Sequence, residues 1–219
     1  MQNKKTLYHF IVDKSGSMAG MEQQTIDGVN TQLEEIQELK NKMPEQEIIC
    51  SLTFFNSSIH DILINEPVIQ LEPLNMTIYR PDGMTALLDA VGKSITQIEK
   101  THTKQLENNE MSVVMVIITD GYENASQYFD YHEISKMIGR LDETGKWTFS
   151  FLGADFDAIH TSKMMNIRKE NVMNFSKRKY NSMMYDLKES ISDHAYEKRK
   201  GNLKRDIFDK FRVKDRRNN

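Results

Sequence analysis

Residues 7–17 of the chain read LYHFIVDKSGS. The run Leu7–Val12 has the length and composition of a strand that is buried on both faces of a sheet. The turn that follows carries a carboxylate and two hydroxyls at alternating positions, Asp13, Ser15 and Ser17, with Gly16 between the hydroxyls. Three hard oxygen ligands on one side of a tight turn suit a small divalent cation.

Strand-like and helix-like segments alternate along the rest of the chain. Further strands are expected at 48–55, 113–118, 147–152 and 172–175, and a short edge strand at 59–64 returns antiparallel. Helices are expected at about 21–42, 85–101, 131–142, 155–165 and 180–196. Such alternation is typical of a parallel sheet with helices on both faces. The sequence therefore predicts a three-layer α/β fold, doubly wound, with a mostly parallel sheet and one short antiparallel edge strand.

The composition describes a soluble globular protein. Of 219 residues, 38% are hydrophobic and 28% charged, and the mean hydropathy is -0.61. The first apolar run is too short for a signal segment or a membrane helix. Cys50 is the single cysteine, so no internal disulfide can form. These observations favour a cytoplasmic location and no transmembrane segment.

Charge divides the chain into two parts. Residues 197–219 hold ten Lys or Arg and four acidic residues, a net charge of +6, whereas the whole chain carries -3. We therefore expect one domain over 1–196 and a basic tail over 197–219. In the tail, Leu203, Ile207, Phe208 and Phe211 share one face of a possible amphipathic helix. A charged and partly disordered terminus fits at least as well, and attraction of the tail to the acidic body is a third interpretation. We predict no specific nucleic-acid partner.

Oxygen-bearing side chains follow two of the predicted parallel strands. Asp13 ends the first strand, Asp120 follows the strand 113–118, and Thr85 stands where a helix is expected to begin. Ligands of such sheets bind beyond the carboxyl ends of the strands, and these ends share one edge. With Ser15 and Ser17 the set contains only hard oxygen ligands, which suit Mg²⁺, Mn²⁺ or Ca²⁺ better than zinc.

Each of these residues also has an ordinary structural interpretation. Asp13 is suited to capping the following helix, and Ser15 and Ser17 to bonding nearby backbone in a turn. Thr85 is placed as a helix N-cap, a role that is compatible with metal ligation. An aspartate before glycine, as at Asp120, is common in turns. The combination, rather than any single residue, favours a metal site.

Three motifs resemble those of von Willebrand factor type A (vWA) domains. Asp13-Lys14-Ser15-Gly16-Ser17 resembles their Asp-x-Ser-x-Ser motif, Gly83-Met84-Thr85 their threonine segment, and Thr119-Asp120-Gly121 their third motif. The motifs stand in the family's order over residues 5–196. The lack of a signal segment and of disulfides points to the intracellular, bacterial-type branch of the family.

The resemblance implies a metal-ion-dependent adhesion site (MIDAS) and a binding function rather than an enzyme. Ser15, Ser17 and Thr85 would supply hydroxyl ligands, with Asp13 and Asp120 bound directly or through water, and Mg²⁺ is the expected ion. An Asp or Glu carboxylate of a partner protein would complete the coordination.

Two other functions stay open at this point. Some intracellular vWA proteins are regulatory subunits of ATPase or chelatase-like complexes, which is a variant of the binding function. A metal-dependent phosphohydrolase with Asp13 as nucleophile is a separate class. It is less favoured, because such enzymes usually carry a second carboxylate two residues on, where this chain has Ser15.

Overall fold

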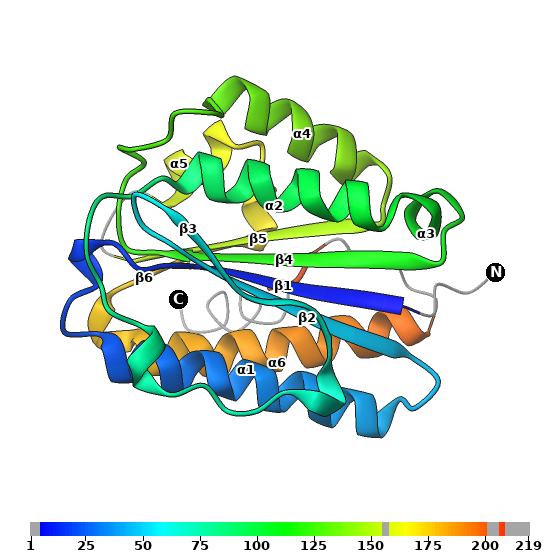
Figure 1. The fold of residues 1–219 in the computed structure, drawn as a ribbon. Helices are drawn as coiled ribbons and strands as arrows, with labels where there is room; N and C mark the ends of the chain where they lie inside the picture. Colours follow the sequence, from blue (N-terminus) through cyan, green and yellow to red (C-terminus); the bar gives the residue numbers. More distant parts are fainter. Residues whose placement is uncertain (1–4, 155–157, 201–205, 209–219) are drawn as a thin grey trace, which may run out of the picture.

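A computed structural model describes residues 5–154, 158–200 and 206–208. The strands are β1 (Lys5–Asp13), β2 (Glu47–Phe55), β3 (Ile59–Pro67), β4 (Met111–Thr119), β5 (Trp147–Ala154) and β6 (Val172–Phe175). They form one sheet in the order β3-β2-β1-β4-β5-β6 (Figure 1). Among the described residues β3 alone pairs antiparallel, at the edge beside β2. The α/β fold with a mostly parallel sheet is therefore confirmed, although β3 is longer than the expected 59–64.

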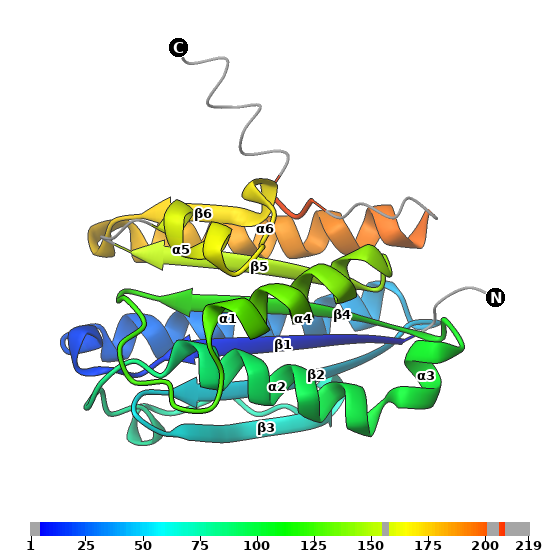
Figure 2. The same ribbon diagram turned by 90° about the horizontal axis from the view of Figure 1, so that it is seen from above.

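Helices cover both faces of the sheet. Their bounds are α1 (Glu22–Lys42), α2 (Leu87–Thr101), α3 (Thr103–Glu107), α4 (Tyr131–Glu143), α5 (Ala158–Met164) and α6 (Tyr180–Arg199), with 3-10 turns η1 (Gly16–Met18), η2 (Val68–Gln70), η3 (Met76–Ile78), η4 (Lys169–Asn171) and η5 (Lys177–Lys179). α1 and α6 lie together on one face, and α2 and α4 on the other (Figures 1 and 2). The short helix α3 was not predicted from the sequence.

Two apolar clusters hold the three layers together. One joins α1 and α6 to the sheet through side chains such as Phe10, Val116 and Leu187. The other joins α2 and α4 through side chains such as Ile11, Ile117 and Val91. Val116 and Ile117 are adjacent in β4, so their side chains enter opposite layers. This arrangement explains why β4 is an unbroken apolar run: all nine of its residues are buried.

Part of the tail packs against the domain. Ile207 and Phe208 are buried in the cluster of α1 and α6, and the Ile207 backbone N–H donates to Asn171 Oδ1 (2.7 Å). Leu203 and Phe211, the other two apolar positions of the predicted amphipathic helix, lie outside the described residues. α6 runs to Arg199, beyond residue 196, so the division at 196 stays a prediction.

The start of α2 differs from the expectation. The helix begins at Leu87 with Ala86 as its N-cap residue, so Thr85 is not the cap. The free N–H groups of its first turn are bonded from another segment: Leu88 N–H donates to Glu123 Oε2 (3.0 Å) and Asp89 N–H to Ser126 Oγ (3.0 Å). Side chains of the segment 123–126 thus cap α2, so the Thr85 hydroxyl does not act as its cap.

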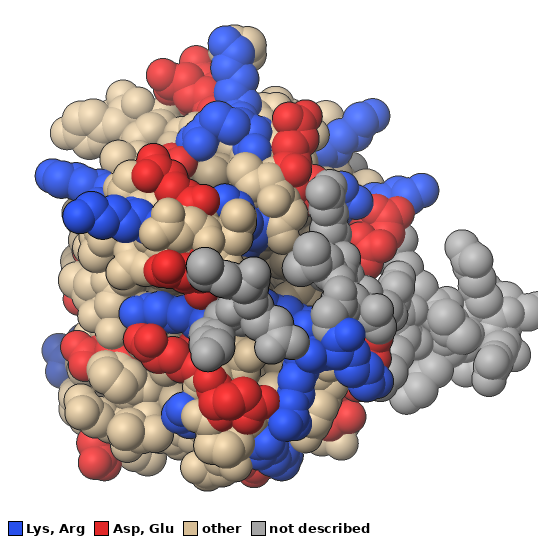
Figure 3. All heavy atoms as spheres, turned by 90° about the vertical axis from the view of Figure 1, so that its right-hand side faces the viewer, with Lys and Arg blue, Asp and Glu red and all other residues tan. Residues whose placement is uncertain are grey.

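The carboxyl ends of the parallel strands all lie at the left of Figure 1, where β1 leads into η1. The opposite side, on which β1 begins, carries Lys and Arg side chains interspersed with Asp and Glu (Figure 3). The oxygen-bearing residues singled out in the sequence therefore belong to the left-hand edge.

Candidate metal site

Asp13 is fixed by contacts from three segments. Its side chain is fully buried. Its Oδ1 accepts a hydrogen bond from the Ser15 backbone N–H (2.7 Å), and its Oδ2 accepts one from Thr119 Oγ1 at the end of β4 (2.5 Å). The Tyr79 hydroxyl donates to the Asp13 carbonyl oxygen. These bonds hold the carboxylate in one orientation at the end of β1.

Ser15, Ser17 and Asp120 form a chain of hydrogen bonds. Ser17 Oγ donates to Asp120 Oδ1 (2.6 Å), and the hydroxyl oxygens of Ser15 and Ser17 are 3.0 Å apart. The chain joins the turn after β1 to the residue that follows β4, which are 103 positions apart in the sequence. Ser15 and Asp120 are buried whereas Ser17 is exposed, so the cluster opens to solvent at Ser17.

Thr85 lies in the loop before α2, and its hydroxyl is near that of Ser17. A Cβ atom built on Gly121 would be 3.5 Å from both Ser17 Oγ and Thr85 Oγ1, so these two hydroxyls border one small space beside Gly121. Asn124 fixes the Thr85 backbone through two hydrogen bonds. The Thr85 N–H donates to Asn124 Oδ1 (2.8 Å), and the Asn124 backbone N–H donates to the Thr85 carbonyl oxygen (3.0 Å).

The turn after β1 is tied directly to the loop of Thr85. Gly16 N–H donates to the Gly83 carbonyl oxygen (3.0 Å). Gly83 has φ +71°, a left-handed conformation that favours glycine. The structure thus brings together all five residues expected from the sequence, Asp13, Ser15, Ser17, Thr85 and Asp120.

Two buried carboxylates give the cluster an excess of negative charge. Burial raises the pKa of the Asp13 carboxyl, and the charge of Asp120 raises it further, while the hydrogen bonds from Thr119 and Ser15 lower it. The net upward shift means that the ionised form of Asp13 is poorly stabilised by its surroundings. A positive charge in the cluster would relieve this cost.

The residues present fit a hard divalent cation. Asp120 Oδ2 belongs to a side chain only 1% exposed and lies 2.5 Å from the ammonium group of Lys177, so this buried anionic oxygen already faces a positive charge. The described residues hold no group of three His, Cys, Asp or Glu that could bind a metal. Any ion here would depend on hydroxyls as well as the two carboxylates, which suits Mg²⁺ or Mn²⁺ better than a soft metal.

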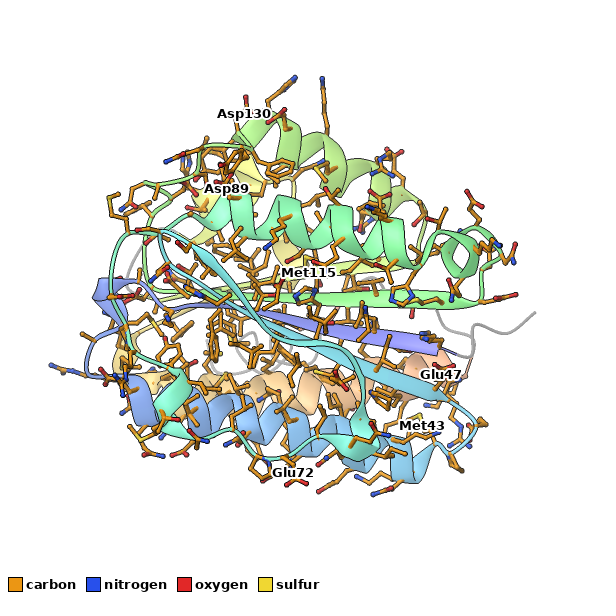
Figure 4. The ribbon with its side chains drawn as sticks, viewed as in Figure 1. Met43, Glu47, Glu72, Asp89, Met115 and Asp130 are labelled. Carbon is orange, nitrogen blue, oxygen red and sulfur yellow. The ribbon has the colours of Figure 1, made fainter. Side chains whose placement is uncertain are left out.

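The loop between β4 and α4 supports the site, and sequence reasoning missed most of it. Asp89 in α2 accepts the backbone N–H groups of Gln127, Tyr128 and Phe129 (2.8–2.9 Å). It lies at the start of α2, below the loop that leads to α4 (Figure 4). Asp89 is the acidic residue in the first turn of α2. Its bonds to the loop had no signal in the sequence.

A lysine also reaches the cluster, from a segment that the sequence did not connect with it. Lys177 in η5 follows β6, and its Nζ lies 2.5 Å from Asp120 Oδ2. The same ammonium group donates to the Ser17 carbonyl oxygen (2.7 Å).

No protein-family model matches the chain, and no curated protein matches its sequence. Solved structures do resemble it. Proximal thread matrix protein 1 from the mussel byssus superposes with a TM-score of 0.54 at 13% identity over 86% of this chain. A von Willebrand factor type A protein from Catenulispora acidiphila gives 0.55 at 9% identity over 84%. The fold is that of a vWA domain.

Other structures with this vWA fold are described as holding metal. One of the byssus protein has a zinc-occupied MIDAS motif (TM-score 0.53, 13% identity, 87% of this chain and 46% of that one). Another is the manganese-loaded TRAP protein of Plasmodium vivax (0.54, 10% identity, 84% of this chain and 73% of that one). The chain spans 46% and 42% of the first byssus structure and the Catenulispora protein, less than half of each. Among the described helices none is both long and apolar enough to cross a membrane.

Proposed function

We propose that this vWA domain is a divalent-cation-dependent protein-binding module. Asp13, Ser15, Ser17, Thr85 and Asp120 hold the cation, which is Mg²⁺ in the cell, and a partner protein contributes an Asp or Glu carboxylate to it. The domain binds and does not catalyse, and it works in the cytoplasm.

The observation that carries the proposal is the convergence of these five oxygen-bearing side chains. They come from three loops at one edge of the sheet, and hydrogen bonds link Ser15, Ser17 and Asp120 into one chain. Helix capping does not account for Thr85, because the first turn of α2 is bonded by Glu123 and Ser126 instead. The metals named for two proteins of the same fold support the choice of a divalent ion.

The environments of two of the five residues, Asp13 and Ser17, indicate their parts in the site. The Asp13 carboxylate is buried and held by Thr119 and Ser15, so it supplies fixed negative charge. Ser17 is exposed and marks the side from which a partner reaches the site. When bound, the cation supplies a concentrated positive charge that attracts a partner carboxylate.

The surface beside the site also suits a protein partner. Met84, next to Thr85, and Tyr122, two residues after Asp120, are both 55% exposed. Exposed large apolar side chains next to a polar centre are common in protein interfaces. A partner that places its carboxylate at the site can bury these two side chains at the same time.

Calorimetric titration of Mg²⁺ into the purified protein tests the first half of the proposal. Saturable binding is expected for the wild type and for Asp27→Ala, a control that removes an exposed carboxylate from α1. Asp13→Ala should abolish it. Equal binding by wild type and Asp13→Ala would refute the site.

Affinity capture tests the second half. Wild type and Ser15→Ala are compared in Mg²⁺ and in chelator. A partner should be retained only by the wild type, and only in Mg²⁺. Substituting that partner's exposed Asp and Glu residues one at a time should identify one whose loss ends binding. Metal-dependent turnover of phosphate esters, abolished by Asp13→Asn, would favour a phosphohydrolase instead.

A further inference from the structure

The ammonium group of Lys177 contacts the carboxylate of Asp120, one of the proposed metal ligands. Its Nζ is 2.5 Å from Asp120 Oδ2. It also donates to the carbonyl oxygen of Ser17 (2.7 Å), so two residues of the proposed metal site contact the same group. The Asp120 side chain is 1% exposed and that of Lys177 is 34% exposed. Lys177 therefore covers Asp120 from the solvent side.

The contact joins two opposite charges at short range. The two oxygens of Asp120 have separate partners: Oδ2 pairs with Lys177, and Oδ1 accepts a hydrogen bond from Ser17 Oγ. The ammonium thus pairs with the Asp120 carboxylate. A divalent cation in the cluster would compete with Lys177 for the Asp120 carboxylate. The cation and the ammonium would also repel each other strongly, because they would lie a few ångströms apart in a partly buried site.

Lys177 reaches the site from a separate part of the fold. It lies in η5, between β6 and α6, and is 160 residues away from Ser17 in the sequence. Arg178 and Lys179, its neighbours in η5, are exposed. The basic segment Lys177–Lys179 thus places one of its three charges on the site, and the other two provide matched controls.

We propose that Lys177 sets the cation affinity of the site: its ammonium occupies Asp120 when no metal is bound and is displaced when metal enters. The inference rests on the proposed function. It adds a residue from η5 to the five that hold the metal, and it pairs Asp120 with an ammonium group when no metal is bound.

Substitution of Lys177 tests this by calorimetric titration with MgCl₂ alone. Lys177→Met keeps the length of the side chain and removes its charge, and we expect it to bind Mg²⁺ about tenfold more tightly than the wild type, since one nearby unit charge is removed. Lys177→Arg keeps the charge and should stay within about twofold of the wild type. Lys179→Met, which removes a charge from the same turn, should also stay within about twofold of it.

Chemical labelling tests the displacement in the wild type, where no substitution can disturb folding. Acetylation by an amine-reactive ester, followed by mass spectrometry, compares the labelling rates of Lys177 and Lys179 in Mg²⁺ and in chelator. Mg²⁺ should raise the rate at Lys177 several-fold and leave Lys179 unchanged.

The outcomes separate this inference from the proposed function. If Lys177→Met binds Mg²⁺ no more tightly than the wild type, or Mg²⁺ does not raise labelling of Lys177, the inference is refuted while the metal site stands. If neither the wild type nor Lys177→Met binds Mg²⁺, the metal site itself is refuted.

Discussion

Asp13→Asn should separate the stability of the domain from its metal binding. The Asp13 side chain is fully buried, and asparagine has nearly the same shape. Its carbonyl oxygen can keep the bond from the Ser15 N–H, and its amide can donate to Thr119 Oγ1, which donates to Asp13 Oδ2 in the wild type. The substitution therefore removes one buried charge and leaves the packing in place.

The sign of the effect follows from the raised pKa of Asp13. Because burial raises the pKa above that of the unfolded chain, the folded state binds more protons in the interval between the two values. Stability is thus full below the unfolded pKa and falls as the pH rises through the folded pKa. Without metal at neutral pH, Asp13→Asn should be the more stable protein by about 1 kcal/mol, or about 2–4 °C in melting temperature.

Added metal should reverse that order. At a Mg²⁺ concentration of about 100 Kd, a single site stabilises the wild type by about 2.7 kcal/mol, and Asp13→Asn should gain nothing. Thermal unfolding followed by circular dichroism, in chelator and in Mg²⁺ at pH 5 and pH 8, measures both effects. A variant that is less stable than the wild type in chelator at pH 8, or that gains as much from Mg²⁺, would refute the reasoning.

Three further substitutions test the scaffold. Gly92→Ala would place a Cβ about 2.5 Å from the ring of Phe129, and urea unfolding should show a loss of about 1–3 kcal/mol; an unchanged midpoint would contradict this packing. Tyr79→Phe removes the bond to the Asp13 carbonyl and should cost about 1 kcal/mol in the same assay, whereas no cost would mean that the bond contributes nothing. Burial lowers the pKa of Lys198 to about 8, so the unfolded chain binds more protons above that pH; the stability of the wild type relative to Lys198→Met should therefore rise between pH 8 and about 10.4, and a flat difference would count against it.

The sheet was predictable because its strands carry their signal locally. In β4 the side chains of Val116 and Ile117 enter different layers, so the whole strand had to be apolar, and a central parallel strand followed from that run alone. The positions of Asp13 and Asp120 at one edge followed in turn from the direction of the strands. The proximity of residues more than 100 positions apart could thus be predicted from the sequence.

The loops were less predictable, because their bonds depend on tertiary contacts. Thr85 reads as a helix cap by its residue type, yet α2 starts two residues later and Glu123 bonds its first turn. Asn124 fixes the Thr85 backbone from the loop after β4. Lys177 is one of three consecutive basic residues, and no periodicity distinguishes it from Arg178 or Lys179. The five proposed ligands could be named from motif and topology, whereas the residues that hold or cover them required the fold.

A crystal structure grown with Mn²⁺, with diffraction recorded at the manganese absorption edge, tests the central claim most directly. One strong anomalous peak is expected in the cluster, in contact with the hydroxyl oxygens of Ser15, Ser17 and Thr85 and next to Asp13 and Asp120. No peak there, or a peak bound only by residues outside this set, would contradict the account.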